Sequence, residues 1–167
     1  LVEEKRRASR ELEETLDRAR QEAASSSGRL TALRQARLRF EGYQEGPRRV
    51  LAMARDGEIP GVVGPVAEVL KVEGGYEKAI DAALGGAAQF IVVKSWENAE
   101  RAVEALKSSQ SGRATFLPLD TIRESGLDAG EAKAMSGVEG ALKATDVVRC
   151  DPLFKPVVAH LLGRVIV

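Results

Sequence analysis

The fold of this chain is decided by the stretch Gly61-Val62-Val63-Gly64-Pro65-Val66-Ala67-Glu68-Val69-Leu70-Lys71-Val72. Its many valines favour extended backbone, with a helical turn near Ala67. A related stretch begins at Gly137-Val138-Glu139-Gly140, and the residues that follow the two stretches correspond at an offset of 76 to 78 positions. The sequence therefore predicts an internal repeat, in which one structural unit occurs twice.

The correspondence continues through the second copy. Its pairs are Val69, Leu70 and Lys71 with Val147, Val148 and Arg149; Tyr76 with Phe154; Ala79 and Ile80 with Val157 and Val158; and Leu84 and Gly85 with Leu162 and Gly163. Arg164–Val167 takes the place of Phe90–Val93, and the sequence stops there. Because repeated units usually pack about a pseudo-twofold axis, we expect a fragment whose shortened second copy leaves an apolar face or a sheet edge uncovered.

Helices and strands alternate between the two stretches. Apolar residues at helical spacing predict a helix over 76–84 that ends at Gly85-Gly86, and 89–93 has the pattern of a buried strand. Ser95 is the expected cap of a helix that reaches about Lys107, and 113–117 is the next expected strand. This alternation predicts a mixed α/β (α+β) module with helices packed on a mixed or parallel sheet.

Residues 2–40 have the composition of a long helix, since Glu, Arg, Ala and Leu dominate and proline is absent. Mostly apolar residues recur there at alternating steps of three and four, which is typical of a coiled-coil seam. The seam residues are Val2, Leu12, Leu16, Ala19, Ala23, Leu30, Leu33 and Phe40, with Lys5, Ser9, Ser26 and Arg37 at the other positions of the series. So narrow a stripe fits one partner helix, and Gly28 marks a possible kink or break.

A glycine- and proline-containing junction, Glu41-Gly42-Tyr43-Gln44-Glu45-Gly46-Pro47, separates this arm from the rest. We expect a coiled-coil arm over 1–41, a first subdomain with its linker over 42–130, and an incomplete second subdomain over 131–167. Pro47 should open a short helix that runs to about Arg55 and is closed by Gly57. Its expected buried residues are Val50, Leu51 and Ala54.

Positive charge collects around this junction although the whole chain is neutral, with 25 basic and 25 acidic residues. The cluster consists of Arg29, Arg34, Arg37, Arg39, Arg48, Arg49 and Arg55, against only Glu41 and Glu45 before Asp56. Because arginine forks onto phosphate oxygens, the cluster is the best candidate for a nucleic-acid contact. A solvated surface with unrelated salt bridges is an equally good interpretation, since only Phe40 and Tyr43 could stack on bases.

No residue pattern points to catalysis, to a cofactor or to a metal ion. His160 is the only histidine and is expected to be structural, and Cys150, the only cysteine, to be a buried apolar residue of a protein from a reducing cytoplasm. Gly85-Gly86 follows a helix instead of opening one, so it lacks the amides of a phosphate cradle. No Walker sequence occurs, and no apolar stretch approaches the roughly 20 residues that cross a bilayer.

The remaining large side chains have expected packing roles. Trp96 and Phe116 are predicted to be core or edge residues of the module, and Met53 and Met135 to fill gaps in its core.

Several motifs closely resemble the hinge of structural maintenance of chromosomes (SMC) proteins. They are Gly42-Tyr43, Arg48-Arg49-Val50-Leu51, 61–68, Tyr76-Glu77, Ala79-Ile80, Leu84-Gly85-Gly86 and Gly112-Arg113-Ala114-Thr115-Phe116-Leu117-Pro118-Leu119. The resemblance covers roughly residues 42 to 167, and the arm lies where the family has its coiled coil. The two copies match the two subdomains of that hinge, but the glycine-rich segments that line the family's dimer interface have no counterpart before Val167.

The resemblance implies a non-catalytic hinge with three partners: a second hinge in a bacterial-type homodimer, a returning coiled-coil helix of the same protein, and DNA. ATP and Mg²⁺ would be bound by head domains outside this sequence, and the protein would act in chromosome condensation and segregation at the nucleoid in the cytoplasm. The arginines named above lie where DNA contact is expected. The alternatives are a purely structural joint without DNA contact and, from another class, a small-ligand module that uses the turns near Gly64 and Gly85.

Overall fold

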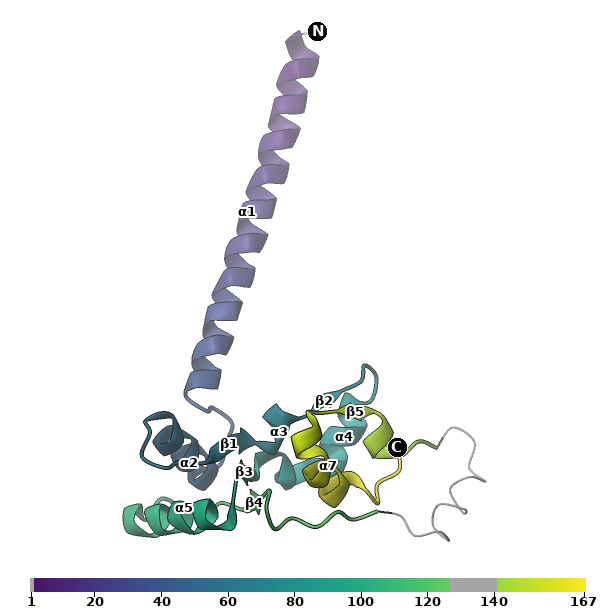
Figure 1. Ribbon diagram of the computed structural model, residues 1–167. Helices are drawn as coiled ribbons and strands as arrows, with labels where there is room; N and C mark the ends of the chain where they lie inside the picture. Colours follow the sequence, from purple (N-terminus) through teal and green to yellow (C-terminus); the bar gives the residue numbers. More distant parts are fainter. Residues whose placement is uncertain (1, 127–140) are drawn as a thin grey trace. The chain divides into compact units, whose positions relative to one another are not determined.

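The computed structural model describes residues 2–126 and 141–167 (Figure 1). Met135, the boundary expected at 130/131 and the stretch Gly137–Gly140 lie outside the described residues. The chain forms two compact units, Leu1–Glu41 and Gly42–Val167, which are described separately here.

The first unit is a single α-helix, α1 (Val2–Leu38). The break expected at Gly28 is absent, since the helix runs through that residue without interruption. Phe40 was placed in the seam, but it lies beyond the end of α1 with a φ of 52°. This left-handed turn ends the helix, and the backbone N–H of Glu41 closes it by donating to the oxygen of Ala36 at 3.0 Å.

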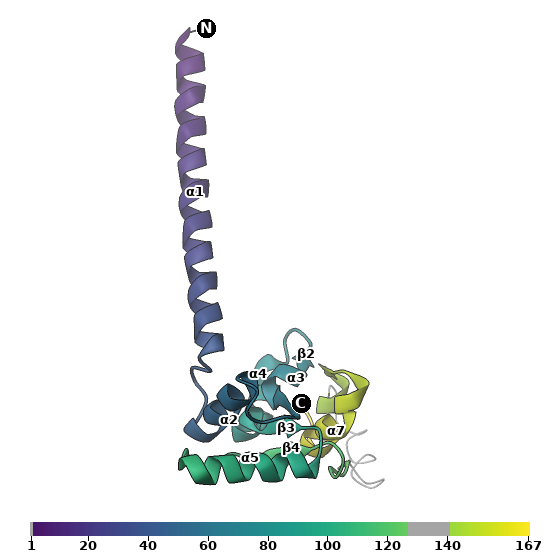
Figure 2. The same ribbon diagram turned by 60° about the vertical axis from the view of Figure 1, so that its left-hand side comes forward.

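The second unit contains a three-stranded sheet in the order β1 (Val62–Pro65), β3 (Ile91–Val93) and β4 (Phe116–Pro118). β1 is antiparallel to β3, and β4 is parallel to it, which confirms the mixed sheet. Two helices, α2 (Glu45–Arg55) and α5 (Trp96–Ser109), pack against each other beside this sheet (Figure 2). The strands expected at 89–93 and 113–117 begin two and three residues later than predicted, and they end at Val93 and Pro118.

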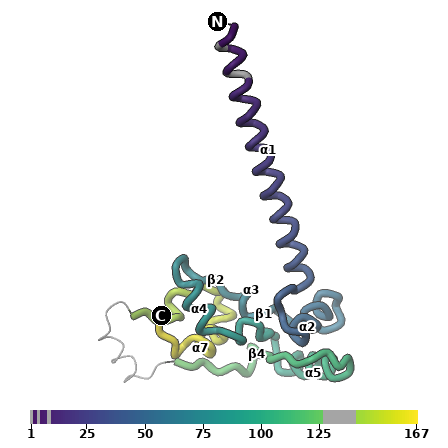
Figure 3. The backbone as a smooth tube through the Cα atoms, turned by 180° about the vertical axis from the view of Figure 1, so that it is seen from behind, coloured from purple at the N-terminus to yellow at the C-terminus, as the bar shows by residue number. Residues whose placement is uncertain are grey.

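The second unit also contains a two-stranded sheet that joins the two repeats. Its strands are β2 (Lys71–Val72) and β5 (Val148–Arg149), which are antiparallel. The helices around it are α3 (Val66–Val69), α4 (Glu77–Leu84) and α7 (Lys155–Leu162), with three 3-10 turns: η1 (Gly85–Gln89), η2 (Ala144–Asp146) and η3 (Pro152–Phe154). α4 and α7 are equivalent at an offset of 78 residues, and they pack side by side (Figures 1 and 3).

Backbone hydrogen bonds show how far the repeat extends. In the first copy the N–H of Val66 donates to the oxygen of Phe90 at 2.9 Å, and in the second the N–H of Ala144 donates to the oxygen of Val165 at 3.0 Å. Phe90 is therefore equivalent to Val165, one residue later than the sequence comparison placed it. The offset between equivalent residues is 78 in α4 and α7 and 75 at Phe90 and Val165, because the first copy has η1 after its helix and the second copy has no equivalent turn. The strand expected at 164–167 is an isolated bridge between Lys143 and Ile166.

The two repeats share their core. Ile80 of the first copy packs with Val148, Val158 and Leu162 of the second, and these side chains are buried. A second cluster joins Val66, Val92 and Leu117 to Val157 of the second copy. The third cluster lies under α2 and contains Met53, Ile59 and Ala102, which confirms Met53 as a core residue. On α2, Met53 is buried where Ala54 was expected, beside Val50 and Leu51.

Candidate interfaces: arm seam, arginine cluster and sheet edge

The seam of α1 is exposed to solvent. Leu12 is 68% exposed and Leu33 is 67% exposed, and Val2, Leu16 and Leu30 are also exposed. Ala19 and Ala23 lie between these leucines and are exposed too. An isolated apolar stripe of this kind gains stability only by packing against another helix. Within the described residues, the apolar stripe of the arm is therefore exposed along α1.

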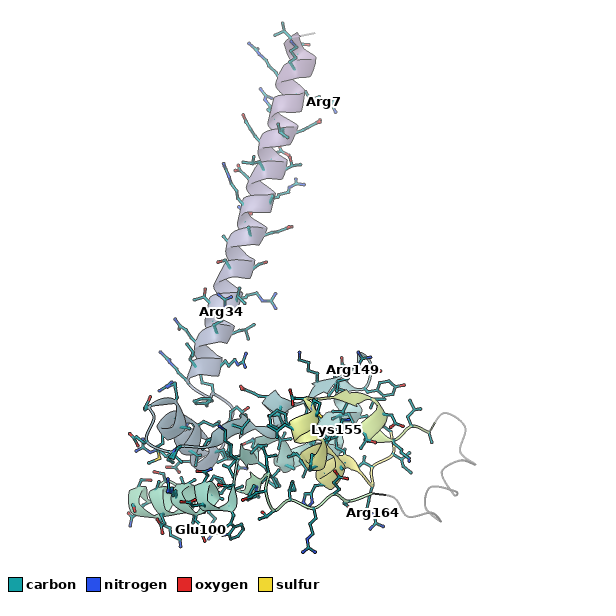
Figure 4. All side chains as sticks on the ribbon, in the orientation of Figure 1. Arg7, Arg34, Glu100, Arg149, Lys155 and Arg164 are labelled. Carbon is teal, nitrogen blue, oxygen red and sulfur yellow. The ribbon has the colours of Figure 1, made fainter. Side chains whose placement is uncertain are left out.

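Charged side chains off the seam pair along α1. Arg7 Nε lies 3.1 Å from Glu11 Oε1, and Arg20 Nη1 lies 3.5 Å from Asp17 Oδ1. These pairs are one helical turn apart and exposed, so each stabilises the helix by only about 0.3–0.5 kcal/mol. Figure 4 labels Arg7 and Arg34, which project from α1 near its two ends.

The seven candidate arginines are divided between the two units. Four belong to the first unit, namely Arg29, Arg34, Arg37 and Arg39, and three belong to α2 in the second unit, namely Arg48, Arg49 and Arg55. All seven side chains are exposed.

Two of these arginines contact carboxylates. Arg39 Nη1 lies 3.9 Å from Glu41 Oε1, and Arg55 Nε lies 3.2 Å from Asp56 Oδ1. On α2, Arg48 and Arg49 are exposed, whereas Val50 and Met53 are buried. The exposed face of α2 therefore carries positive charge outward, as a phosphate contact requires.

The edge strand β4 borders an apolar groove that the sequence did not indicate. The groove has a volume of about 530 Å³ and lies between α5 and β4; its lining includes Trp96, Val103, Phe116 and Pro118. Trp96 is 56% exposed, so it is an edge residue and not a core residue. Its indole Nε1 donates to Glu100 Oε1 at 2.9 Å, and its backbone N–H donates to the carboxylate of Asp120 at 2.9 Å. Phe116 is half-buried against the cluster under α2.

A second hollow of about 490 Å³ continues this groove. It shares Val103 and Lys107 with the first and extends to Gln110 and Arg113, so that apolar surface follows both α5 and the segment before β4. The end near Glu100 is acidic, and the end near Arg113 is basic. Figure 4 labels Glu100 on α5.

In the second repeat the face equivalent to β3 is more open. Ile166 is 47% exposed, whereas its equivalent in the first repeat, Ile91, is fully buried. In the first repeat β4 pairs with Ile91, but the described part of the second repeat contains no such strand. The greater exposure of Ile166 is a property of the described residues, and the shortened second copy stays a prediction.

The single histidine and the single cysteine both lie near α7. His160 Nδ1 lies 2.9 Å from the backbone oxygen of Arg123, which agrees with a structural role. Cys150 is half-buried and not fully buried as expected, because it follows the two-residue strand β5 at the surface. Burial raises the pKa of its thiol, Lys155 lowers that pKa, and Asp151 raises it.

Within residues 2–126 and 141–167, no group of three potential His, Cys, Asp or Glu ligands is close enough to hold a metal ion. No helix in those ranges is both long and apolar enough to span a membrane. The two glycines proposed for a small-ligand site serve the backbone: Gly64 lies opposite Val92 in β1, and Gly85 ends α4 with a φ of 47°. The groove nearest Gly85 is lined mostly by apolar residues.

Comparisons with known proteins agree with this arrangement. Residues 59–167 match the family described as "SMC proteins Flexible Hinge Domain". The chain is 35% identical over 90% of its length to the chromosome partition protein Smc of Halothermothrix orenii, and 32% identical over 99% of its length to that of Bacillus subtilis. It spans only 13% and 14% of those two relatives.

Two solved structures of hinge domains are also similar. One is described as an asymmetric dimer of the Geobacillus stearothermophilus SMC hinge domain, with 38% identity and a TM-score of 0.84 over 92% of this chain and 61% of that chain. The other is the hinge domain of the Pyrococcus furiosus SMC protein, with 32% identity and a TM-score of 0.60 over 80% of this chain and 65% of that chain.

Proposed function

This chain belongs to the family of SMC flexible hinge domains, and on that basis we propose that it joins two SMC arms by pairing with a second hinge. The second hinge is another copy of the same chain, as in a bacterial homodimer. The similar hinge from Geobacillus stearothermophilus forms a dimer, which supports this proposal.

The outer edge of β4, which pairs with no other strand of the described residues, is the observation that carries the proposal. The backbone oxygen of Thr115 accepts from the N–H of Ile91 at 2.8 Å, and the N–H of Leu119 donates to the oxygen of Val93 at 2.9 Å. Because the backbone groups of successive residues point to opposite sides of a strand, the N–H and C=O of Phe116 point away from β3. An unpaired strand edge beside an apolar groove suits the addition of a strand from a partner. The groove beside Trp96 then receives side chains of that strand.

Light scattering after size-exclusion chromatography tests this interface. We expect Trp96→Asp to weaken the dimer at least about thirtyfold, because a buried interfacial tryptophan contributes roughly 2 kcal/mol or more. Leu153→Asp is the matched control: Leu153 is 58% exposed against 56% for Trp96, but it lies in η3 outside the groove. If the Trp96 variant remained a tight dimer, the β4 edge would not be part of the interface. If the unchanged chain were monomeric, the proposed dimer itself would be contradicted.

We propose further that the seam of α1 packs against a returning helix of the same protein. The exposed leucines on both sides of Ala19 and Ala23 support this pairing. A contact between two helices would bury these leucines, and each Å² of apolar surface removed from water stabilises the pair by about 25 cal/mol. The remaining parts of the SMC protein would include heads that bind ATP and Mg²⁺, and its work would be chromosome condensation and segregation at the nucleoid in the cytoplasm.

The finer part of the proposal is a DNA contact by the arginine cluster at the junction. The exposure of all seven arginines supports it. Because each neutralised phosphate releases counterions, binding through several arginines falls steeply as salt increases. A purely structural joint, the alternative, binds DNA negligibly at every salt concentration.

Titration of labelled single- and double-stranded DNA at two salt concentrations separates these alternatives. We expect the variant with Arg37, Arg39, Arg48 and Arg49 changed to Glu to lose binding, and the salt slope to fall by about 0.9 for each lost phosphate contact on duplex DNA. Two further variants, one with Arg37 and Arg39 changed to Glu and one with Arg48 and Arg49 changed to Glu, show by their loss of binding which unit contacts DNA. A variant with Arg6, Arg7, Arg10 and Arg18 changed to Glu has the same net charge and is the control. An equal loss of DNA binding in that control would show that the effect depends on the total charge of the chain and not on the arginines at the junction.

A further inference from the structure

A pocket of about 800 Å³ lies in the second repeat, outside the arm seam, the arginine cluster and the groove beside β4. Its apolar lining comes from β5 and α7 and consists of Val148, Val158 and Ala159. Three basic side chains and one acidic side chain also line it, namely Lys143, Arg149, Lys155 and Glu124. Three positive charges against one negative charge leave a net positive charge beside an apolar surface.

The equivalent groove of the first repeat has the opposite charge. It has a volume of about 410 Å³, and its charged lining residues are Glu77, Lys78 and Asp81, two acidic and one basic. At the offset of 78, Glu77 corresponds to Lys155 and Asp81 to Ala159. Because both repeats build their groove from the same elements, the fold does not require positive charge in the second one.

Further differences between the repeats add polar groups to the second pocket. The pairs are Pro65 with Lys143, Ala67 with Thr145, and Val72 with Cys150. The apolar part is kept with smaller side chains, since Val148 and Val158 stand where the first repeat has Leu70 and Ile80. The second repeat therefore combines a wider pocket with ammonium, guanidinium and hydroxyl groups, which are the groups that bind anions.

The position of Lys155 is unfavourable for the helix that it opens. Glu77 stands at the equivalent position of α4, where the helix dipole stabilises a carboxylate. The first turn of α7 contains no acidic residue and begins with Lys155 instead. Helix stability therefore does not account for this lysine, whereas an anion in the pocket does.

The basic groups are available to a ligand. Within residues 2–126 and 141–167, no ion pair joins Lys143 or Lys155 to a carboxylate. Arg149 is oriented by Glu73, because its Nε and Nη2 donate to Oε1 at 3.0 Å and 2.6 Å, and its Nη1 is left for another acceptor. Figure 4 labels Arg149 and Lys155, which belong to β5 and to the start of α7. The charge of Lys155 also lowers the pKa of the Cys150 thiol, which lines the same pocket.

One wall of the pocket is fixed by the chain that follows β4. This wall is formed by residues 124–126. His160 Nδ1 of α7 lies 2.9 Å from the backbone oxygen of Arg123, and a Cβ on Gly163 would overlap the backbone oxygen of Ser125. The wall is thus held against the end of α7 before a ligand binds, which lowers the entropic cost of binding.

We propose that this pocket binds a small organic phosphate monoester. A phosphate monoester carries roughly −1.5 to −2 charges at pH 7, which complements the net positive charge of the lining. The guanidinium of Arg149 and the ammonium of Lys155 suit its oxygens, and Val148 and Val158 offer apolar surface to its organic part. This site goes beyond the proposed function and depends neither on hinge pairing nor on the DNA contact.

Protection of Cys150 from alkylation tests the site. Cys150 lines the pocket and is the only cysteine, and iodoacetamide is uncharged, so the ratio of its rates without and with ligand at one pH reports occupancy. Phenyl phosphate combines the phosphate with an apolar body, whereas benzyl alcohol has the body without the charge. We expect saturating phenyl phosphate to slow alkylation at least about tenfold, because only the ligand-free fraction reacts, and benzyl alcohol to leave the rate unchanged. Alkylation that phenyl phosphate does not slow, or that benzyl alcohol slows equally, would overturn the proposal.

Lys155→Glu places the residue of the first repeat in the second pocket. We expect it to weaken phenyl phosphate binding at least about tenfold, since one charge-assisted contact is replaced by repulsion. The Tm should stay equal or rise, because glutamate suits the first turn of α7. Lys78→Glu is the matched control: Lys78 is exposed, lines the first groove and gives the same change in net charge. Equal weakening in both variants, or a lower Tm for Lys155→Glu alone, would contradict the assigned role of Lys155.

A short oligothymidylate distinguishes the other source of phosphate groups. Its phosphodiesters carry the charge of a nucleic-acid backbone without a monoester. We expect it to protect Cys150 less than phenyl phosphate does. Protection by the oligonucleotide without protection by phenyl phosphate would assign the pocket to a nucleic-acid backbone and overturn the small-ligand site.

Discussion

Lys71 and Arg149 are Cα partners in the antiparallel pair of β2 and β5, and they are also equivalent residues of the two repeats. An antiparallel pair between equivalent residues places the pseudo-twofold axis between them. Arg149, labelled in Figure 4, also reaches across the repeats to Glu73, with Nη2 2.6 Å and Nε 3.0 Å from Oε1. Backbone bonds and one ion pair therefore fasten the repeats at their axis.

The Glu73–Arg149 pair is predicted to contribute little stability. The Arg149 side chain is 79% exposed and that of Glu73 is 40% exposed, so water and salt screen the attraction. A double-mutant cycle with Glu73→Ala and Arg149→Ala, measured by urea unfolding, should give a coupling of about 0.2–1 kcal/mol that decreases with added salt. A salt-independent coupling above about 2 kcal/mol would contradict this account.

Gly46→Ala is predicted to destabilise the second unit by about 1–3 kcal/mol. Gly46 lies in the first turn of α2 and is buried, and a Cβ there would overlap the backbone oxygen of Arg113. Backbone cannot be displaced as easily as a flexible side chain, so the cost is that of overpacking. Thermal unfolding followed by circular dichroism measures the change. Gly28→Ala, where a Cβ would meet nothing within 4 Å, is the control and should instead favour α1 by about 1 kcal/mol.

Asp120→Ala is predicted to destabilise the start of α5 by about 1 kcal/mol. The Asp120 carboxylate accepts from the N–H of Trp96 at 2.9 Å and 3.1 Å, while the Ser95 side chain accepts from the N–H of Asn98. Two side chains thus satisfy two of the unpaired N–H groups of the first turn. Hydrogen exchange of the Trp96 amide should accelerate in the variant. Asp120→Asn, which keeps an acceptor oxygen, should recover most of the protection.

Cys150 is predicted to titrate above the usual range of a cysteine. Burial favours the neutral thiol and raises its pKa, and the positive charge of Lys155 opposes this shift. Because the folded pKa lies above the unfolded one, the stabilisation is present below the unfolded pKa and is lost as the pH rises through the folded pKa. The pH midpoint of iodoacetamide alkylation should therefore lie higher in the folded chain than in urea. Lys155→Met should raise it further, and an unchanged midpoint would contradict the assigned role of Lys155.

Local patterns were sufficient for most helices. The seam predicted α1, Ser95 predicted the start of α5, and the apolar spacing of 76–84 predicted α4, because capping and amphipathic periodicity depend on neighbours within one or two turns. The break predicted at Gly28 was wrong, because one glycine destabilises a helix by only about 1 kcal/mol and the surrounding helix-forming residues offset this cost.

The candidate interfaces were predictable only in part. The arm seam followed from periodicity, whereas the DNA contact of the arginines stays a prediction. The groove beside β4 was missed because Trp96 and Phe116 look alike in sequence as large apolar residues. Only the tertiary packing shows that Trp96, at the start of α5, is exposed, and that Phe116, in the edge strand β4, packs under α2.

The sequence by itself determined that this chain has a helical arm and a duplicated α/β unit with the motifs of an SMC hinge, because periodicity and repetition are written in the order of the residues. Only the tertiary structure decided how the copies meet: Lys71 lies beside Arg149, the copies share one core, and the segment after β4 contacts α7. These relationships join residues far apart in the chain, and their free energy comes from surfaces that exist only after both copies have folded.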